Sequence, residues 1–166
     1  AVPAMIAADA VCTIAGPNGR REARVEDIVI GPGVTSLETS EMVVDFLFPA
    51  RPARSGDAYL RFIPRTEMDI AVVGAGVSLT LDETGICTSA RVALGAVAAT
   101  QLVVEDGAAA LIGSTLDDAA MAKLDAAAKA VCRPIDDKRG TIEYRTKVAG
   151  VLARRAAGIA QQRAEG

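Results

Sequence analysis

The chain of 166 residues is long enough for one domain, or for one small domain with a further fragment. Its net charge of −3 and the lack of any long basic run argue against nucleic acid or an anionic membrane surface as a partner. No apolar run approaches the roughly 20 residues that a membrane-spanning helix needs, so no membrane insertion is expected.

The composition also restricts the chemistry. The chain has no histidine, which removes the commonest general base and the commonest metal ligand. The three cysteines, Cys12, Cys87 and Cys132, are far apart and form no C-x-x-C pair. We therefore expect buried, reduced thiols in a cytoplasmic protein rather than a zinc or iron–sulfur site. The chain begins without an initiator methionine or a basic segment, and we interpret this as a cut end rather than a signal peptide.

The first 49 residues predict short elements joined by turns. An alanine-rich segment at 3–10 is compatible with a short helix, and residues 41–48, rich in Val and Phe, predict a strand. Asn18-Gly19 indicates a turn, because both residues tolerate positive φ. The other elements expected here are strands at 11–15 and 20–25 and a helical turn at 25–30, ended by Gly31-Pro32-Gly33.

Residues 59–100 form the centre of the predicted fold. They contain two apolar runs, at 70–81 and 86–98, joined by a short charged turn that includes Gly85. Two runs of this kind around a short glycine-containing turn predict an antiparallel hairpin. We expect the rest of the C-terminal part to pack on this hairpin.

Three helices are predicted after the hairpin, at residues 105–111, 117–131 and 141–162. Asp117 and Asp118 suit the first turn of the second helix because of the helix dipole, and Pro134 ends that helix. The predicted apolar face of the second helix comprises Leu116, Met121, Leu124 and Ala128. The third helix is expected to bury Ile142, Val148, Leu152 and Ile159 and to expose Arg145, Lys147, Arg154 and Arg155.

Strands precede helices along the chain. This order predicts an α+β fold, with a small antiparallel β-sheet covered by about three helices, rather than alternating βαβ units. Residues 50–57 are rich in Pro, Gly, Ser and charge and predict an exposed linker. The sequence therefore divides into a first region at 1–49, a linker at 50–57 and a domain at 58–166.

The glycines of Val73-Gly74-Ala75-Gly76 invite a dinucleotide-binding interpretation. That motif requires Gly or Ala three residues after the second glycine, where a helix must open. The position is Leu79, and strand-like sequence continues past it. The alternative is a strand whose glycines admit a close neighbour or a bulge.

Arg65 and Asp69 could form an ion pair that fixes the turn between them. Residues 139–145 cross the start of the last helix, and Arg139 and Glu143 have the spacing of neighbours on a helix. We expect this segment to hold the Asp136-Asp137 loop to the helix or to a partner.

Two pairs of adjacent carboxylates could suggest acid–base chemistry. A helix start explains Asp117-Asp118 better, and a solvated loop explains Asp136-Asp137. A histidine-assisted nucleophile is excluded because the chain has no histidine. We therefore predict neither a catalytic nor a metal-binding residue.

Two separated blocks carry a resemblance to a known family. Residues 136–145, DDKRGTIEYR, resemble an Asp-x-Arg-Gly-Ser-x-x-Tyr-Arg signature, and an earlier block resembles Tyr-x-Lys/Arg-Phe…Arg…Asp-x-Ala-x-Val. Both signatures are typical of the flavoprotein (medium) subunit of the molybdenum hydroxylase family, which includes aerobic carbon monoxide dehydrogenase and xanthine dehydrogenase. The earlier block comprises Tyr59, Arg61, Phe62, Arg65, Asp69, Ala71 and Val73.

The resemblance implies a C-terminal part of such a subunit. Residues 1–49 would then be the C-terminal remnant of the FAD-binding domain, and residues 58–166 the small C-terminal domain. The intact subunit would bind FAD non-covalently and relay electrons from the [2Fe-2S] clusters of a small subunit to an external acceptor. Those clusters would receive electrons from a large molybdopterin-binding subunit, which sets the substrate. We expect the chain itself to carry no stoichiometric FAD, because the family's Gly-rich phosphate-binding loops precede this region.

Two site residues follow from the resemblance. In the family a Lys at the position of Arg61 approaches the flavin ring, and an apolar residue at the position of Val43 packs against the ring. We expect both to face the flavin from neighbouring strands, with Arg61 stabilising negative charge on the reduced ring. The alternatives are a solvated arginine on a strand edge for Arg61 and an ordinary core residue for Val43. For the chain as a whole, the alternative is a free-standing α+β interaction domain or scaffold without redox activity.

Overall fold

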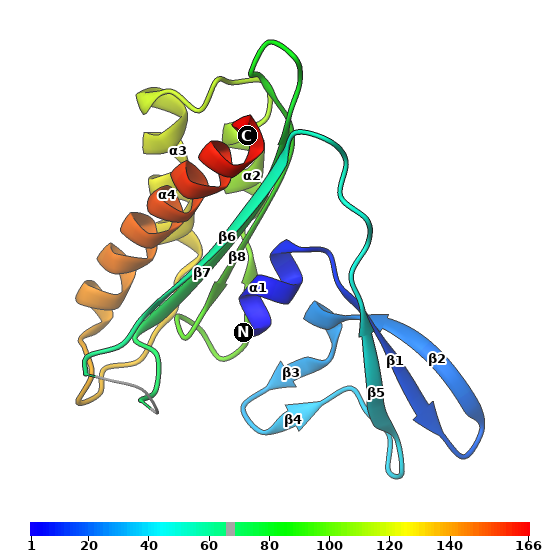
Figure 1. Ribbon diagram of the computed structural model, residues 1–166. Helices are drawn as coiled ribbons and strands as arrows, with labels where there is room; N and C mark the ends of the chain where they lie inside the picture. The colour runs from blue at the N-terminus through cyan, green and yellow to red at the C-terminus, as the bar shows by residue number, and fades with distance from the viewer. Residues whose placement is uncertain (66–68) are drawn as a thin grey trace.

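The computed structural model describes residues 1–65 and 69–166, and it contains two groups of strands joined by an extended segment (Figure 1). Residues 66–68 of the turn predicted at 65–69 lie outside this description. The larger group is a four-stranded antiparallel sheet with the order β6-β7-β8-β9. We call it the C-terminal sheet, and its strands are β6 (Ser55–Phe62), β7 (Val73–Leu81), β8 (Cys87–Gly95) and β9 (Leu102–Val103).

The predicted hairpin is confirmed as β7 and β8, which pair antiparallel along their whole length. The Asp82 carboxylate fixes the connecting turn, because it accepts hydrogen bonds from the backbone N–H groups of Thr84 and Ile86 at 2.8 and 2.9 Å. Gly85 has φ 85° in this turn, a conformation that favours glycine. Strands β6 and β9 extend the hairpin on its two sides.

Three helices cover one face of the C-terminal sheet, which confirms the predicted α+β fold (Figure 1). Helix α4 (Ile142–Glu165) lies directly on β6 and β7, and α2 (Glu105–Leu111) lies on β8. Helix α3 (Asp118–Val131) packs against α2 and α4. Asp117 caps α3 by accepting a hydrogen bond from the Ala120 N–H at 2.8 Å, as its place before the helix predicted. The predicted α3 face is also confirmed, with Leu124 and Ala128 fully buried.

The predicted buried stripe of α4 is partly wrong. Ile142 is exposed and Arg145 is buried, whereas Leu152 is buried as expected. The helix meets the sheet through small side chains because β6 carries Gly56 at the contact, where an added Cβ would lie 2.0 Å from the Ala160 carbonyl oxygen. Backbones this close leave room only for alanine. The buried alanines of α4 are Ala149, Ala153, Ala156, Ala157, Ala160 and Ala164.

The first region contributes one helix and several short strands. Helix α1 (Val2–Ala7), which overlaps the predicted segment 3–10, packs on the other face of the C-terminal sheet, against β7 and β8. We call the second group of strands the N-terminal sheet. It has the order β2-β1-β5 and comprises β1 (Val11–Gly16), β2 (Gly19–Arg24) and β5 (Met42–Leu47). Between β2 and β5 lie a 3-10 turn (Val25–Asp27) and a small hairpin of β3 (Val29–Gly31) and β4 (Val34–Thr35).

The linker between the two groups is shorter than predicted. Strand β6 begins at Ser55, so the last three residues of the predicted 50–57 segment belong to the C-terminal sheet. The predicted free thiols are confirmed, since Cys12, Cys87 and Cys132 are buried and unpaired. Burial raises the pKa of the Cys132 thiol to about 11, which makes it unreactive at neutral pH.

Candidate functional site

The second face of the C-terminal sheet carries very small residues near one end. Tyr59 and Arg61 project to this face from β6, because alternate residues of a strand share a face. Their cross-strand partners on β7 are Gly76 and Gly74, and Gly95 of β8 lies opposite Gly74. The two large side chains of β6 therefore stand beside three glycines, which we call the glycine floor.

These glycines are required by close packing. An added Cβ would lie 2.9 Å from the Tyr59 hydroxyl oxygen at Gly74, and 2.5 Å from the Pro3 carbonyl oxygen at Gly76. At Gly95 it would lie 2.6 Å from Cγ of Pro3. The Gly74-Ala75-Gly76 segment therefore admits α1 and the tyrosine ring, which confirms the strand interpretation over a dinucleotide-binding loop.

A hollow of about 210 Å³ lies where α1, β6 and the glycine floor meet. Arg61 is exposed on its rim, and burial raises the pKa of the Tyr59 phenol while the charge of Arg61 opposes that rise. The hollow thus combines a cation, an aromatic ring and a flat backbone floor. Besides Tyr59 and Arg61, it is lined by Pro3, Ala71, Gly74, Gly95, Ala96 and Gln101, together with the first two residues of the chain.

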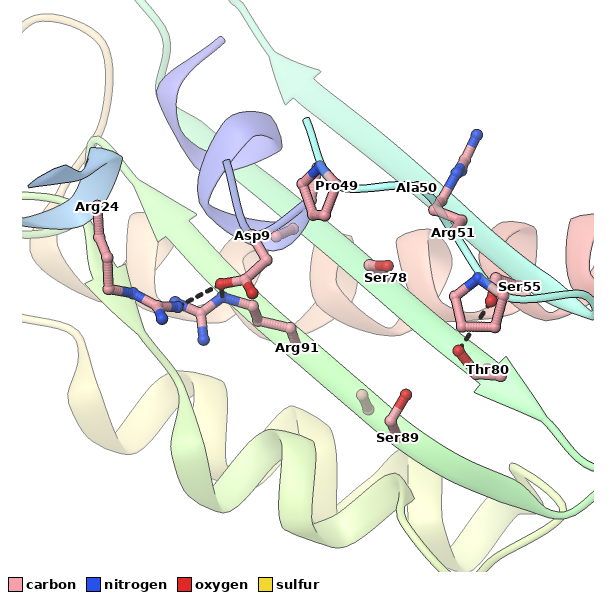
Figure 2. A pocket seen from close by; sticks show the side chains of 14 residues that line it. Asp9, Arg24, Pro49, Ala50, Arg51, Ser55, Ser78, Thr80, Ser89 and Arg91 are labelled. Carbon is pink, nitrogen blue, oxygen red and sulfur yellow. Dashed lines mark hydrogen bonds and ion pairs between the residues drawn. The ribbon is translucent and has the colours of Figure 1, made fainter. Parts of the chain in front are cut away.

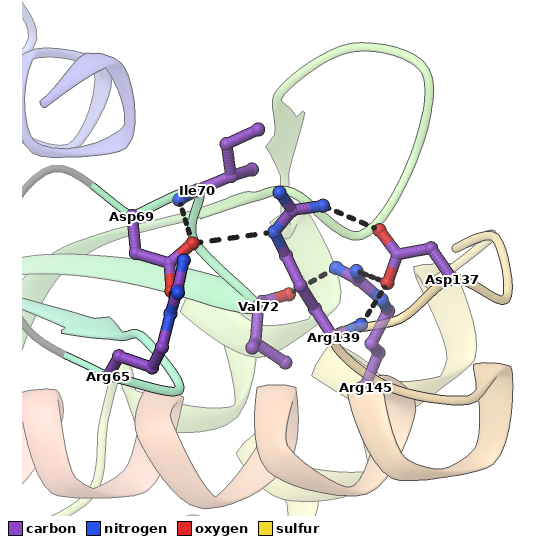
Figure 3. A network of polar contacts seen from close by, with 7 residues as sticks. All are labelled: Arg65, Asp69, Ile70, Val72, Asp137, Arg139 and Arg145. Atoms are coloured by element: carbon purple, nitrogen blue, oxygen red, sulfur yellow. Dashed lines mark hydrogen bonds and ion pairs between the residues drawn. The ribbon is translucent and has the colours of Figure 1, made fainter.

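A buried arginine holds the far rim of this hollow. Nη1 of Arg145 donates a hydrogen bond to the carbonyl oxygen of Val72 at 2.8 Å (Figure 3), and another to that of Ala96 at 3.2 Å. Val72 precedes β7, and Ala96, in the left-handed region with φ 64°, follows β8. Arg145 is 3% exposed, so the expectation that it faces solvent is wrong. Its position lets one side chain of α4 fix two loops that border the hollow.

Two carboxylates connect Arg145 to the surface (Figure 3). Asp137 accepts from Nη2 of Arg145 at 2.7 Å, and the backbone N–H of Arg139 together with Arg145 lowers the pKa of Asp137 to about 2. Asp69 accepts from Nε of Arg65 at 3.0 Å, a contact that lowers its pKa and confirms the predicted pair. Arg139 lies between the carboxylates, 3.6 Å from Asp69 and 3.4 Å from Asp137, rather than beside Glu143. The 139–145 segment therefore holds the Asp137 loop to α4, as predicted.

Val43 and Arg61 do not lie on neighbouring strands. Val43 belongs to β5, which pairs with β1, whereas Arg61 belongs to β6, which pairs with β7. Strands β5 and β6 follow each other in the sequence but belong to different sheets, because the linker turns the chain between them. Val43 is half-buried opposite Ile14, which is fully buried.

The sequence argument did not place Tyr59 or Arg145 at the site. The spacing of Tyr59 from Arg61 on one strand was a usable signal, since residues two apart share a face. Arg145 is the last residue of the Asp-x-Arg-Gly-Ser-x-x-Tyr-Arg signature, but that signature does not indicate which groups the arginine contacts. Among the described residues, no group of three or more acidic or cysteine side chains is placed to hold a metal ion. Nor does the described part of the chain contain a helix with the length and apolarity to cross a membrane.

The described elements define a layered α+β domain, with an antiparallel sheet covered on one face by helices. The chain belongs to the CO dehydrogenase flavoprotein C-terminal domain family, whose sequence profile matches residues 58–160. The carbon monoxide dehydrogenase medium chain of Afipia carboxidovorans is 38% identical over 152 residues, which cover 92% of this chain and 52% of the relative. The corresponding chain of Hydrogenophaga pseudoflava is 35% identical over 159 residues, which cover 95% and 54%.

Solved structures agree with the sequence relatives. Reconstituted CO dehydrogenase from Oligotropha carboxidovorans superposes with a TM-score of 0.92 at 36% identity, covering 98% of this chain and 56% of that one. The chain thus spans about half the length of the relatives that it matches.

Proposed function

We propose that the chain is part of the FAD-containing medium subunit of a molybdenum hydroxylase similar to carbon monoxide dehydrogenase. The observation that carries this proposal is the identity of 38% with a carbon monoxide dehydrogenase medium chain over 92% of the chain. Residues 1–49 are then the end of the FAD-binding domain, and the C-terminal sheet with its helices is the domain that borders it. The buried free thiols fit a cytoplasmic location.

The hollow beside Arg61 fits one end of a flavin rather than a whole FAD. Its volume of about 210 Å³ is below the range of roughly 300–1,000 Å³ for sites that enclose a small molecule. The part of the ring that enters would lie beside Gly74 and Gly95, which line the hollow, with Tyr59 next to it and the Arg61 guanidinium at its edge. The phosphates would be held by the part of the subunit that this chain does not span.

FAD, when bound, accepts and releases the electrons of the reaction. Arg61 supplies a fixed positive charge at the edge of the hollow, and such a charge favours an anionic form of a neighbouring group. Tyr59 is held by its contact with Gly74, so its ring can exclude water from one side of the hollow. Arg145 keeps the loops at Val72 and Ala96 in place around the floor. We propose no catalytic residue on this chain.

The role proposed for Val43 is separate from that of Arg61 and has less support. We propose that it packs against the flavin ring in the intact subunit, as the resemblance implies. Its position opposite Ile14, half-buried, also suits an ordinary packing residue. Val43 can therefore contribute packing but no charge.

The partners in this proposal are a molybdopterin-binding large subunit and a small subunit with [2Fe-2S] clusters. The relatives on which it depends are medium chains of carbon monoxide dehydrogenase. The medium subunit would relay electrons from the iron–sulfur clusters through FAD to an external acceptor. The substrate is set in the large subunit.

The test is Arg61→Gln in the intact subunit with FAD bound. Loss of the positive charge should lower the flavin midpoint potential, because the anionic reduced ring loses a favourable electrostatic contact. Arg61→Lys keeps the charge and should keep the potential close to that of the unmodified subunit. An equal potential in all three proteins, with FAD fully bound, would remove Arg61 from the flavin site.

A further inference from the structure

A second and larger hollow, of about 420 Å³, lies at the other end of α1 (Figure 2). Its floor is the same face of the C-terminal sheet, six residues along β6 from Arg61. Here the floor carries hydroxyl groups instead of glycines. Ser55 of β6, Thr80 of β7 and Ser89 of β8 form one row across three strands, and Ser78 lies in the next row. Ser55 and Thr80 hydrogen-bond to each other at 2.8 Å, and Ser78 and Ser89 present their hydroxyls to the hollow.

One wall consists of two arginines from different sheets. Arg24 ends β2, and Arg91 lies in the middle of β8. Asp9 and Glu26 each contact both guanidinium groups, and Nε of Arg91 also donates to the Ile6 carbonyl oxygen at 2.7 Å. These contacts use Nε and Nη2 of each arginine, and neither Nη1 has a hydrogen-bond partner among the described residues. The carboxylates therefore orient the two guanidinium groups without using all of their donors.

The roof is a stiff segment that carries a third arginine. Pro49 and Pro52 fix their own φ angles and restrict the residue before each of them, which limits collapse of the roof onto the floor. Arg51 lies between them and contacts Asp57 through Nη1 alone, at 2.7 Å. Arg51 lines the hollow and keeps N–H donors besides the one that contacts Asp57.

The backbone between α1 and β1 is held in an uncommon conformation at Asp9. Asp9, which contacts both wall arginines, has φ 57°, and a residue other than glycine adopts this left-handed region at a cost. That conformation directs the chain from α1 into β1 and places the carboxylate between Arg24 and Arg91 (Figure 2). The wall is therefore built by the fold and does not depend on freely moving side chains.

We propose that this hollow binds a small organic oxoanion, with a phosphate ester or a carboxylate as its charged end. Three arginines line the hollow, and three carboxylates, Asp9, Glu26 and Asp57, pair with them, so the excess is in hydrogen-bond donors and not in net charge. The hydroxyl row adds groups that can donate to an anion and also bond to hydroxyls on the rest of the ligand. The volume exceeds that of a bare inorganic ion and falls within the range for small organic ligands.

The site is separate from the proposed flavin contact. Ala7, Ala8 and Asp9, at the end of α1, line this hollow, whereas Pro3 and the start of α1 line the hollow beside Arg61. The inference therefore does not depend on the proposed function. It predicts binding by the chain in the absence of flavin.

The experiment is isothermal titration calorimetry of the 166-residue chain at fixed low ionic strength. Ribose 5-phosphate probes a phosphate ester, gluconate probes a carboxylate, and ribose is the neutral control. At least one anion should bind with a stoichiometry of one per chain, and ribose should bind far more weakly. The anion that binds more tightly identifies the charged end. No detectable binding of either anion at about 10 mM, which corresponds to less than about 3 kcal/mol of affinity, would overturn the proposal.

Matched variants locate the binding. Arg51→Gln should weaken the affinity about tenfold because it removes a charged donor, and Ser89→Ala about fivefold because it removes one neutral hydrogen bond. Arg154→Gln, on the exposed side of α4, is the control and should leave the affinity unchanged. Thermal melting checks that each variant is folded. Equal weakening by Arg51→Gln and Arg154→Gln would show general charge attraction and would reject the site.

Discussion

The two sheets of the molecule differ in how much apolar surface they bury. The C-terminal sheet and its three helices enclose one continuous core, which includes the fully buried Leu79, Leu94, Leu111 and Leu124. The N-terminal sheet encloses much less, and its strand β5 exposes large apolar side chains, with Leu47 62% exposed. An apolar surface of this kind is typical of one that another part of a protein covers. The exposed side chains are Met42, Val44, Phe46, Leu47 and Phe48.

The family match at residues 58–160 covers most of the C-terminal sheet and its helices. The C-terminal sheet has two covered faces, with α4 and α2 on one side and α1 on part of the other. Its fold is therefore specified by contacts within the chain. The stability of the N-terminal sheet, by contrast, should depend on a neighbouring surface. Substitutions in the two sheets, or at two positions within one sheet, should therefore change the free energy of unfolding by different amounts.

The largest effect is expected from truncating a core residue of the C-terminal sheet. Leu79→Ala removes a side chain that is 1% exposed and should lower the free energy of unfolding by about 3–4 kcal/mol, because a cavity forms. Phe46→Ala, in the N-terminal sheet, removes a side chain that is 46% exposed and should cost less than about 1 kcal/mol. Urea unfolding followed by circular dichroism measures both. Similar losses at the two positions would mean that the N-terminal sheet has a core of its own.

The next effect tests the close contact between α4 and β6. Gly56→Ala should lower the free energy of unfolding by about 2–3 kcal/mol, since its Cβ would lie 2.0 Å and 2.7 Å from backbone atoms of Ala160 and Ala164. Gly158→Ala is the matched control, because an added Cβ there has no atom within 4 Å. That change should stabilise the chain by about 0.5–1 kcal/mol through helix propensity. Thermal unfolding of both variants should show opposite shifts, and two shifts of one sign would reject the close approach.

Periodicity predicted the hairpin and the helices but could not predict this contact. Apolar spacing selected Ile142 and Val148 as core residues of α4, whereas the structure exposes Ile142 and uses an alanine face. Which face packs depends on Gly56, about 100 residues earlier in the chain. A pattern within one helix carries no information on the size of the residue opposite it. The sequence therefore predicted that α4 is a helix of about this length with one buried face, but it did not predict which residues form that face.

The third effect concerns the buried arginine. Arg145→Met should lower the free energy of unfolding by about 2 kcal/mol, because the carbonyls of Val72 and Ala96 and the Asp137 carboxylate lose their donor. The loss stays moderate because Nε of Arg145 has no hydrogen-bond partner among the described residues, and because Asp137 is 26% exposed and can rehydrate. Arg65→Met removes an arginine that is 78% exposed and should cost less than about 1 kcal/mol. Chemical denaturation distinguishes the two, and equal losses would contradict the burial of Arg145.

The site was predictable only where its residues lie on one strand. Tyr59 and Arg61 share a face by alternation, so their meeting follows from sequence. The partners of Arg145 are backbone carbonyls of two loops, one 73 and one 49 residues away, and neither has a side-chain signature. The expectation that Val43 and Arg61 lie on neighbouring strands was wrong, because the consecutive strands β5 and β6 belong to different sheets. Strand pairing depends on which surfaces are available in three dimensions, and spacing along the chain does not determine it.

The smallest effect is a difference in acid sensitivity between the sheets. One carboxyl group near each sheet has a pKa lowered to about 2: Asp137, in the loop before α4, mainly by the backbone N–H of Arg139, and Glu41, just before β5, mainly by Arg21. A lowered folded-state pKa means that the stabilisation is complete above the ordinary values of 3.8 and 4.5. It is lost as the pH falls from those values to about 2. Protonation of Asp137 and of Glu41 should therefore destabilise the folded chain as the pH falls through this window.

The consequence of protonation should differ between the two groups. Asp137 pairs with buried Arg145, whereas Glu41 pairs with Arg21, whose side chain is 42% exposed. Protonation of Asp137 weakens a contact that reaches the core, so Asp137→Asn should reduce the pH dependence of global unfolding more than Glu41→Gln does. Unfolding midpoints measured between pH 2 and 5 for both variants and for the exposed control Glu83→Gln test this order. A larger effect of Glu41→Gln would place the more important ion pair in the N-terminal sheet and would reverse the comparison between the two sheets.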